Sequence, residues 1–402
     1  MKVLMYGWEF PPNINGGLGI ACYGIVQALL RQNLQIGLVL PRAKKTNGSL
    51  EIVDLASEPE NQADNLTLYY IDSIIKPYLN EQTYSQELKA NPMANQFYGN
   101  DLAAEVRRYA AKAGQLAKTI PHDVIHAHDW LTILAGIEAK KISQKPLFFH
   151  VHALEIDRSG GQINQAIFDI EKQGLYAADK IFAVSKLTRQ NIINQYHIAP
   201  EKIEVIYNGL SESYIQRPYE EEDNKQNIVL FLGRITYQKG PFYFLDVAHK
   251  ILSKRQDIQF AMAGDGDLLR SVIEYAAKLR IGSHVHFLGF LDRNQVKDAY
   301  EHSKVYVMPS ISEPFGLSCL EALALNVPVV ISKQSGAAEV LQHVFKVDFW
   351  DVDLMAEKIM ALIDFPKLRK ELVQNSQPEL TVLNWDNSVK GIIKSYQSQI
   401  SN

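Results

Sequence analysis

Short apolar runs alternate along this chain with longer segments in which apolar residues recur at helical spacing. In the first half, the short runs predict buried strands at residues 2–6, 34–40, 66–71, 124–130, 147–154, 180–185 and 203–207. Residues 20–30 and 103–119 have the spacing of helices. Strands separated by helices are typical of a parallel sheet, so this half is predicted to form a Rossmann-like α/β domain.

Residues 43–100 interrupt this pattern. Apart from the run at 66–71, they are polar and weakly periodic. A long insertion at the ligand edge of a sheet often determines specificity, and we expect such a role here.

A second α/β series follows a polar linker. Asn208-Gly209 ends the last strand of the first half, and the segment up to residue 227 shows no periodicity. The next apolar runs predict strands at residues 228–233, 259–263, 284–288, 304–308 and 328–331.

The end of the chain predicts a separate helix. Asn384-Trp385-Asp386 has the pattern of a helix start, and a helical run follows beyond the last predicted strand. The chain is therefore expected to be an α/β protein with an N-terminal domain (1–207), a C-terminal domain (208–384) and a terminal helix (385–402) that crosses back to the first domain.

Composition narrows the class of protein. Of the 402 residues, 47% are hydrophobic and 21% are charged, and the formal net charge is -4. These values are typical of a globular protein and provide no global basic field for nucleic acid. One basic cluster in the predicted helix 103–119 is interpreted as a solvated face, with membrane docking as the alternative: Arg107, Arg108, Lys112 and Lys118.

Two further features bear on the compartment. Cys22 and Cys319 both lie in apolar helical runs, and we expect them to be reduced core residues. The first residues do not form a signal peptide, and no apolar run approaches the roughly 20 residues of a membrane span. The expectation is a cytoplasmic protein without membrane association.

Two glutamates bracket a turn in the second half. Glu313 follows the predicted strand 304–308, and Glu321 lies about one turn into a helix that begins at Leu317. Open α/β sheets bind ligands at the carboxyl ends of their strands, and the amides of a helix start favour an anion. The two carboxylates therefore mark a candidate ligand site, although one capping and one solvated glutamate would give the same spacing.

Two loops that follow the first strand of each half carry candidate phosphate contacts. The loop at residues 7–19 lacks the dinucleotide fingerprint, but Gly16 and Gly17 would let backbone amides approach a phosphate or sugar. The corresponding loop of the second half contains Arg234 and Lys239, which can neutralise a diphosphate without a metal. A plain tight turn and an ordinary charged loop are the alternatives.

Histidines gather at the ends of two strands in the first half. His126 and His128 are expected to face the same side of their strand, but Asp129 cannot join them as a third ligand, so no metal site is predicted. Asp129 and Trp130 instead suggest a sugar-binding edge, because indoles stack on pyranoses and carboxylates accept from hydroxyls. His152 ends the next strand, as either a ligand contact or a satisfied structural histidine.

Taken together, these motifs resemble the retaining, nucleotide-sugar-dependent glycosyltransferases of family 4. The resemblance covers nearly all of the chain and rests on the Glu-x7-Glu stretch with Pro-Phe-Gly, Gly-Arg…Gln-Lys-Gly, the Gly-Gly loop and the Asn-Gly hinge. The strings His-Ala-His-Asp-Trp and Gly-Gly-Leu-Gly are similar to those of glycogen and starch synthases. The resemblance implies the GT-B fold, in which two Rossmann-like parallel-sheet domains face each other across a cleft.

The resemblance also implies roles for individual residues. Arg234 and Lys239 would hold the donor diphosphate, and Glu313 and Glu321 would contact the hydroxyls of the sugar and the ribose. His152 would be aimed at the donor sugar from the first domain. The remaining donor contacts would be the phosphate loop, the neighbours of the base and the helix-start amides: Gly16, Gly17, Gly289, Phe290, Leu291, Phe315, Gly316 and Leu317. Asp129 and Trp130 would line the acceptor side.

The implied activity is transfer of a hexose, with glucose as the expected sugar, from a nucleotide diphosphate to an α-glucan. No metal or other cofactor is expected, and the leaving phosphate is expected to accept the proton of the acceptor. Another glycan, a lipid-linked sugar or a small molecule are alternative acceptors, and a non-catalytic nucleotide-sugar-binding protein is a third class. Ile14 replaces a lysine found in ADP-glucose-dependent glycogen synthases, and Ser335 replaces a glycine of many relatives. The donor nucleotide, the acceptor and the oligomeric state therefore stay open.

Overall fold

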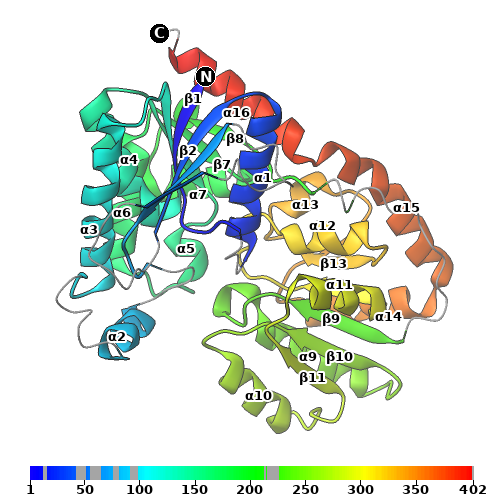
Figure 1. Ribbon diagram of the computed structural model, residues 1–402. Coiled ribbons are helices and arrows are strands. Elements are labelled where there is room, and N and C mark those ends of the chain that lie inside the picture. The colour runs from blue at the N-terminus through cyan, green and yellow to red at the C-terminus, as the bar shows by residue number, and fades with distance from the viewer. Residues whose placement is uncertain are drawn as a thin grey trace.

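The computed structural model describes residues 1–11, 16–41, 51–54, 65–75, 81–90, 98–211, 214 and 226–400. The chain forms two α/β units, one from each half (Figure 1). In the described residues, no helix combines the length and the apolar character that crossing a membrane requires.

The first unit is built on an eight-stranded sheet in the order β3-β4-β2-β1-β5-β6-β7-β8. Seven strands are parallel, and β3 pairs antiparallel with β4 at one edge. The strands are β1 (Lys2–Tyr6), β2 (Gln35–Pro41), β3 (Glu51–Asp54), β4 (Leu66–Ile71), β5 (Val124–His128), β6 (Leu147–Val151), β7 (Lys180–Ala183) and β8 (Ile203–Val205). The helices are α1 (Gly17–Arg31), α2 (Glu81–Ala90), α3 (Leu102–Gly114), α4 (Asp129–Ser143), α5 (Glu155–Arg158), α6 (Gln165–Ala177) and α7 (Lys186–Tyr196), with short 3₁₀ turns η3 (Gln115–Lys118) and η4 (Pro200–Lys202).

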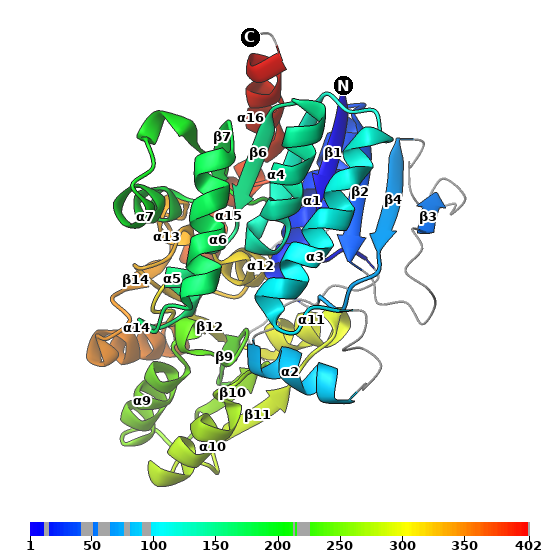
Figure 2. The same cartoon turned by 90° about the vertical axis from the view of Figure 1, so that its left-hand side faces the viewer.

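Both faces of this sheet are covered, as the apolar strands require. Val3 and Met5 of β1 pack in one apolar cluster with α1, whereas Leu4 and Tyr6 pack in another with α3 and α4. This division follows from the two-residue period of a strand. Figure 2 shows α3, α4 and α6 on one face, with α1 behind the sheet.

The second unit is built on a six-stranded parallel sheet in the order β11-β10-β9-β12-β13-β14. Its strands are β9 (Ile228–Leu232), β10 (Gln259–Ala263), β11 (Val285–Gly289), β12 (Val305–Met308), β13 (Val329–Ser332) and β14 (Phe345–Val347). Its helices are α9 (Pro241–Leu252), α10 (Leu269–Lys278), α11 (Arg293–His302), α12 (Leu317–Ala324), α13 (Ala337–Val340), α14 (Val352–Asp364) and α15 (Pro366–Val382), with the 3₁₀ turn η5 (Tyr237–Lys239). The strand order reverses between β1 and β5 in the first sheet and between β9 and β12 in the second, and such switch points are where α/β sheets bind ligands.

The chain crosses between the two units twice, and the crossings lie side by side. Leu210 N–H donates to Leu383 O at 2.8 Å, and a Cβ on Gly209 would lie only 2.3 Å from the backbone of Asn384. The last helix, α16 (Trp385–Ile400), then packs on α1 (Figure 1). Trp385 is 5% exposed, and its ring fills the space beside Gly24, where a Cβ would lie 2.3 Å from the indole.

The prediction of two Rossmann-like parallel sheets is confirmed. The predicted strand at 124–130 is too long, because Asp129 has a left-handed backbone (φ 55°) and begins α4, which places Trp130 in a helix. Arg108 is also not part of a solvated face: its guanidinium pairs with the buried Glu105 at 2.7 Å. The short elements β3, β14, α5 and α13 were not predicted, since they span too few residues for a clear periodicity. The ten-residue α2 was not predicted because its sequence is mostly polar.

Candidate active site

The loops at the switch point of the second sheet bring a cation and an anion together. Lys239 lies on the loop after β9 and Glu313 on the loop after β12, and Lys239 Nζ lies 2.5 Å from Glu313 Oε2. Ser310 Oγ also donates to this oxygen at 3.2 Å. The side chains are 22% and 7% exposed, so the pair sits in a partly desolvated environment, where charge acts more strongly than in water.

The backbone holds Glu313 in place. Its N–H donates to Gln334 O at 2.9 Å, and its C=O accepts from Gly336 N–H at 3.0 Å. Ser335 therefore lies directly opposite Glu313, in a short bridge between the loops after β12 and β13. Main-chain contacts therefore position the backbone of Glu313, while Lys239 and Ser310 hold its carboxylate.

Arg234 lies one residue beyond Gly233 in the same loop as Lys239, and its side chain is half-buried. Close packing fixes this loop: a Cβ on Gly264 would lie 1.9 Å from Gly233 O, and Gly264 itself has φ 136°. The N–H of Ile235 donates to Asp265 O at 2.9 Å. Arg234 and Lys239 thus flank one rigid turn at the sheet edge.

The start of α12 offers main-chain groups. Phe315 and Leu317 are 2% and 9% exposed and pack in the core, so a ligand would meet their backbone. Gly316 has φ 105°, and a Cβ there would press on Met308 and on the Glu313 side chain. The predicted contacts through amides are compatible with this geometry.

Glu321 lies one turn into α12 and is half-buried. Burial raises the pKa of Glu321 to about 7, against the opposing effects of Arg293 and the Tyr300 hydroxyl. Gly289 ends β11 with φ 68°, and Phe290 follows it with 62% of its surface exposed. Leu291 is partly buried against the core. The residues predicted to lie beside the base therefore include one exposed aromatic side chain, that of Phe290.

In the first unit, Gly16 precedes α1 with extended backbone and Gly17 is the first residue of that helix, while residues 12–15, including Ile14, lie outside the described part.

The glycine loop is held by a residue that the sequence did not reveal. Glu9 is 2% exposed, and its carboxylate accepts from Gly19 N–H at 2.8 Å. The signal that could have identified Glu9 is an acidic residue between a predicted strand and a Pro-Pro pair.

His152 directly follows β6, and Asp129 holds its backbone. Asp129 Oδ1 accepts from the N–H groups of His152 at 2.7 Å and Ala153 at 3.4 Å. Burial raises the pKa of Asp129 to about 6, and Arg158 acts in the opposite direction. Asp129 is therefore a support for the His152 turn.

The expected sugar-stacking role of Trp130 does not fit the structure. Its side chain is 5% exposed and lies in the core cluster between the sheet, α3 and α4. The reason is that Asp129 starts a helix, which turns the next residue inward.

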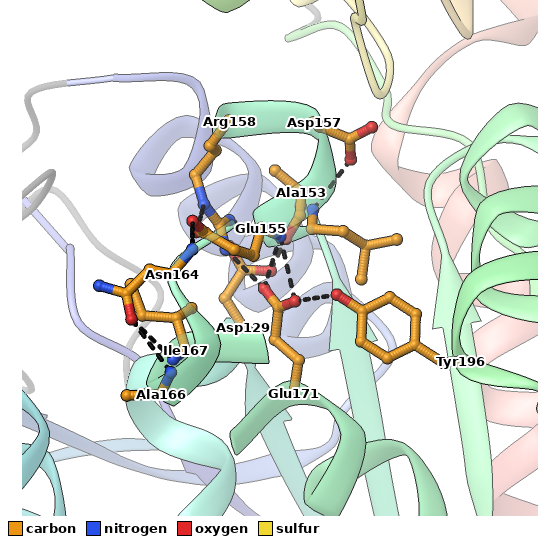
Figure 3. A network of polar contacts seen from close by, with 11 residues as sticks. Asp129, Ala153, Glu155, Asp157, Arg158, Asn164, Ala166, Ile167, Glu171 and Tyr196 are labelled. Atoms are coloured by element: carbon orange, nitrogen blue, oxygen red, sulfur yellow. Dashed lines mark hydrogen bonds and ion pairs between the residues drawn. The ribbon is translucent and has the colours of Figure 1, made fainter. Parts of the chain in front are cut away.

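A buried polar network supports the segment after His152 (Figure 3). Arg158 Nη2 lies 2.5 Å from Glu171 Oε1, and Arg158 Nη1 donates to Ala153 O at 2.9 Å. Glu171 also accepts from Glu155 N–H at 2.9 Å and from the Tyr196 hydroxyl. Burial raises the pKa of Glu171 to about 7, while Arg158 lowers it.

The carboxyl edges of the two sheets touch each other. Ser312, next to Glu313, donates to Asp157 Oδ1 at 2.7 Å across the interface. Glu339 accepts from Lys186 N–H at 2.9 Å and Leu187 N–H at 2.7 Å at the start of α7. These contacts bring the segment that follows His152 against the loop that carries Glu313. Asp157 and Ser312 were not predicted, because no local pattern marks residues that meet only across an interface.

Comparison with known proteins agrees with this architecture. Residues 15–214 match the family model described as Glycosyltransferase Family 4, and residues 214–378 match the model Glycosyl transferases group 1. The chain is 29% identical to an uncharacterised glycosyltransferase of Methanocaldococcus jannaschii, over 99% of this chain and 98% of that protein. It is 25% identical to the glycogen synthase of Mycobacterium tuberculosis, over 95% and 90%.

The structure is similar to sucrose-phosphate synthase from Thermosynechococcus elongatus, with a TM-score of 0.73 at 17% identity over 100% of this chain and 99% of that one. That likeness concerns the fold, and the two family models together span residues 15–378. The chain belongs to the family 4 glycosyltransferases and has the GT-B fold.

Proposed function

We propose that this glycosyltransferase moves glucose from a nucleotide-diphosphate donor to an α-glucan, with retention of configuration and without a metal. The observation that carries the proposal is the meeting of Lys239 and Glu313 beside the Arg234 turn, at a sheet edge that faces the His152 segment. The similarity to a glycogen synthase over 95% of the chain supports the choice of an α-glucan.

In this mechanism, Arg234 and Lys239 stabilise the diphosphate as it leaves with its negative charge. Such preorganised charge is usually the largest contribution to catalysis of group transfer. Glu313 exchanges part of its contact with Lys239 for hydroxyls of the donor sugar, and the α12 amides approach the phosphate. Each group acts in a partly buried environment, which strengthens its effect.

The transfer itself breaks the bond between the anomeric carbon and the diphosphate oxygen and forms one to an acceptor hydroxyl on the same face. The hydroxyl proton passes to the departing phosphate oxygen, so no carboxylate nucleophile is required. This differs from glycosidases that retain configuration, where two carboxylates flank the bond. Glu313 is held against Lys239, and Glu321 lies one turn into α12. The two carboxylates are therefore not arranged as a pair that flanks the bond.

The test is a panel of ADP-, UDP- and GDP-sugars, incubated with and without glycogen and followed as nucleotide release. We expect one donor to give release that depends on glycogen, and elongated α-glucan as product. Release that depends instead on a small sugar or on a lipid-linked sugar would replace the proposed acceptor. Binding of a donor without release under any condition would indicate a non-catalytic binding protein.

The same assay tests the absence of a metal requirement. Because two cationic side chains neutralise the diphosphate, turnover should be unchanged in excess chelator. Loss of turnover in chelator that Mg²⁺ or Mn²⁺ restores would contradict the proposal.

A further inference from the structure

Four histidines form a buried column beneath the carboxyl edge of the first sheet. His126 and His128 lie on β5, His150 lies on β6, and His152 directly follows β6. They are at most 9% exposed. The register pairs His128 with His150, and the two-residue period directs all four rings to one face. Of the four, only His152 has an expected role, the contact with the donor sugar that the family resemblance implies.

The column consists of two pairs whose rings meet edge to edge. His128 Nδ1 lies 2.9 Å from His152 Nε2, and His126 Nε2 lies 3.3 Å from His150 Nδ1. The ring centroids within the pairs are 5.2 and 5.3 Å apart, with interplanar angles of 21° and 3°. Between the pairs, centroids are only 4.4 Å apart, so the two layers stack face to face. Each edge contact is an N–H···N hydrogen bond with one donor and one acceptor.

This geometry does not suit a metal ion, although one nitrogen each of His126, His128 and His150 lies within 4.8 Å of the others. A metal binds an imidazole in the plane of its ring. The rings of His126 and His128 are stacked with an angle of 18°, so their lone pairs lie in separate planes.

The positions of the protons in the His128–His152 pair determine whether Nδ1 of His152 is a hydrogen-bond donor or an acceptor. Burial lowers the pKa of both histidines, that of His152 to about 3, so each ring is neutral and carries one N–H. If His152 donated from Nε2, the proton of His128 would lie on its Nε2, a buried atom without a hydrogen-bond partner. If His128 donates from Nδ1, the remaining N–H lies on Nδ1 of His152, at the end of β6.

Each arrangement leaves one N–H and one acceptor nitrogen without a partner in the described structure, and the two differ in which residue carries the N–H. An unpaired N–H is costly, so it is best placed where a ligand can pair with it. The second arrangement is therefore favoured, because it puts the N–H on His152, which is 9% exposed at the end of β6, and not on His128, which is 0% exposed. A donor-sugar hydroxyl is the group that the proposed function brings to this residue.

We propose that His128 is a positioning residue that holds His152 as the Nδ1–H tautomer, so that His152 donates a hydrogen bond from Nδ1 to a hydroxyl of the donor sugar. This inference rests on the proposed function and on the expectation, from the family resemblance, that His152 contacts the donor sugar. Asp129 contributes by fixing the backbone of His152, so the residue is oriented through both its main chain and its ring.

The tautomer is measured by NMR of protein labelled with ¹⁵N-histidine, with His152→Asn used to assign the signals. We expect wild-type His152 to carry its proton on Nδ1. The variant His128→Phe keeps a stacked ring and removes the hydrogen bond. It should give a mixture of tautomers and a turnover lower by about tenfold, the scale of one hydrogen bond, with a smaller change in KM for the donor.

Two further variants separate positioning from packing. His128→Asn places an amide near the Nδ1 position, so it should restore the tautomer and most of the turnover. His150→Phe keeps the ring that stacks on His152 but does not contact the His128–His152 hydrogen bond, so the tautomer should be unchanged. Thermal unfolding of each variant identifies any loss of turnover that comes from misfolding.

A wild-type His152 protonated on Nε2 would overturn the inference, as would a folded His128→Phe with the wild-type tautomer and turnover. If no donor in the panel is turned over, the proposed function fails while the NMR measurement still reports the tautomer. The two failures are therefore distinguishable.

Discussion

The two halves of this glycosyltransferase hold their polar site residues in different ways. In the second half, Lys239 and Glu313 meet at the ends of two loops, and their contact is supported by backbone hydrogen bonds. In the first half, Asp129 and Arg158 lie beneath the surface and hold the His152 segment through buried hydrogen bonds and ion pairs. The comparison separates charged residues that would contact a ligand from charged residues that hold a turn of the backbone in place.

The difference has an energetic consequence. A buried charge that loses its partner keeps its desolvation penalty, so the first half should respond to substitution mainly by losing stability. The loops of the second half are partly exposed, and their charges should matter mainly when a diphosphate is bound. The predictions below test this division, beginning with the largest effect.

The largest effect is expected from deletion of residues 385–402. This removes α16, in which Trp385 fills the space beside Gly24 and the Tyr396 hydroxyl forms a hydrogen bond with His126 Nδ1 at 2.5 Å. Losing one buried tryptophan already costs about 3–5 kcal/mol, so the shortened chain should not fold at 37 °C. Circular dichroism and thermal unfolding provide the measurement. A shortened chain with wild-type stability and turnover would show that the first half does not depend on the crossing helix.

The second largest effect is expected from removal of the buried guanidinium of Arg158. Arg158→Ala leaves Glu171 and Asp129 without their cation, and should lower the free energy of unfolding by about 3–5 kcal/mol. Arg255→Ala is the matched control, because Arg255 also faces two carboxylates, Asp257 and Asp364, but at the surface. It should cost no more than about 1 kcal/mol. Equal losses in urea unfolding of the two variants would contradict the division.

The same division explains what the sequence could predict. The position of the second-half candidate residues at one sheet edge could be anticipated because Arg234 and Lys239 lie five residues apart on one loop, and Glu313 lies eight residues before Glu321. A local pattern of strand, turn and helix suffices to bring such residues to a sheet edge. The strands were also predictable, because a strand that is buried on both faces has a continuous apolar run.

The first-half supports could not be predicted in this way. The contacts of Glu171 with Arg158 and Tyr196, and that of Ser312 with Asp157, join residues 13 to 155 positions apart. Trp130 was assigned to a sugar-binding edge because indoles stack on pyranoses, but the left-handed backbone of Asp129 starts a helix that directs Trp130 into the core. One sequence does not reveal which polar residues have lost their access to solvent.

A smaller effect in free energy is expected from the diphosphate contacts. Arg234→Ala or Lys239→Ala should lower turnover by about 100-fold, which corresponds to about 2.7 kcal/mol, while leaving thermal unfolding close to that of wild type. Lys141→Ala is the control, because Lys141 forms an exposed pair with Glu138 at 2.7 Å on α4, in the other half of the chain. Turnover near the wild-type value in either loop variant would remove that residue from the mechanism.

The smallest effect concerns Glu321, a half-buried carboxyl in the second half. Because burial raises its pKa to about 7 from an ordinary value near 4.5, the folded chain holds a proton that the unfolded chain has released between these pH values. The contribution of Glu321 to stability is therefore present at pH 4.5, falls as the pH rises towards 7, and is constant above it. Glu321→Gln cannot titrate, so thermal unfolding at pH 5 and pH 8 should show the variant gaining stability relative to wild type at the higher pH. Glu274→Gln, at an exposed position on α10, should follow wild type at both values. Parallel curves for wild type and Glu321→Gln would mean that Glu321 is already ionised at pH 5, as a solvated residue of the second half would be.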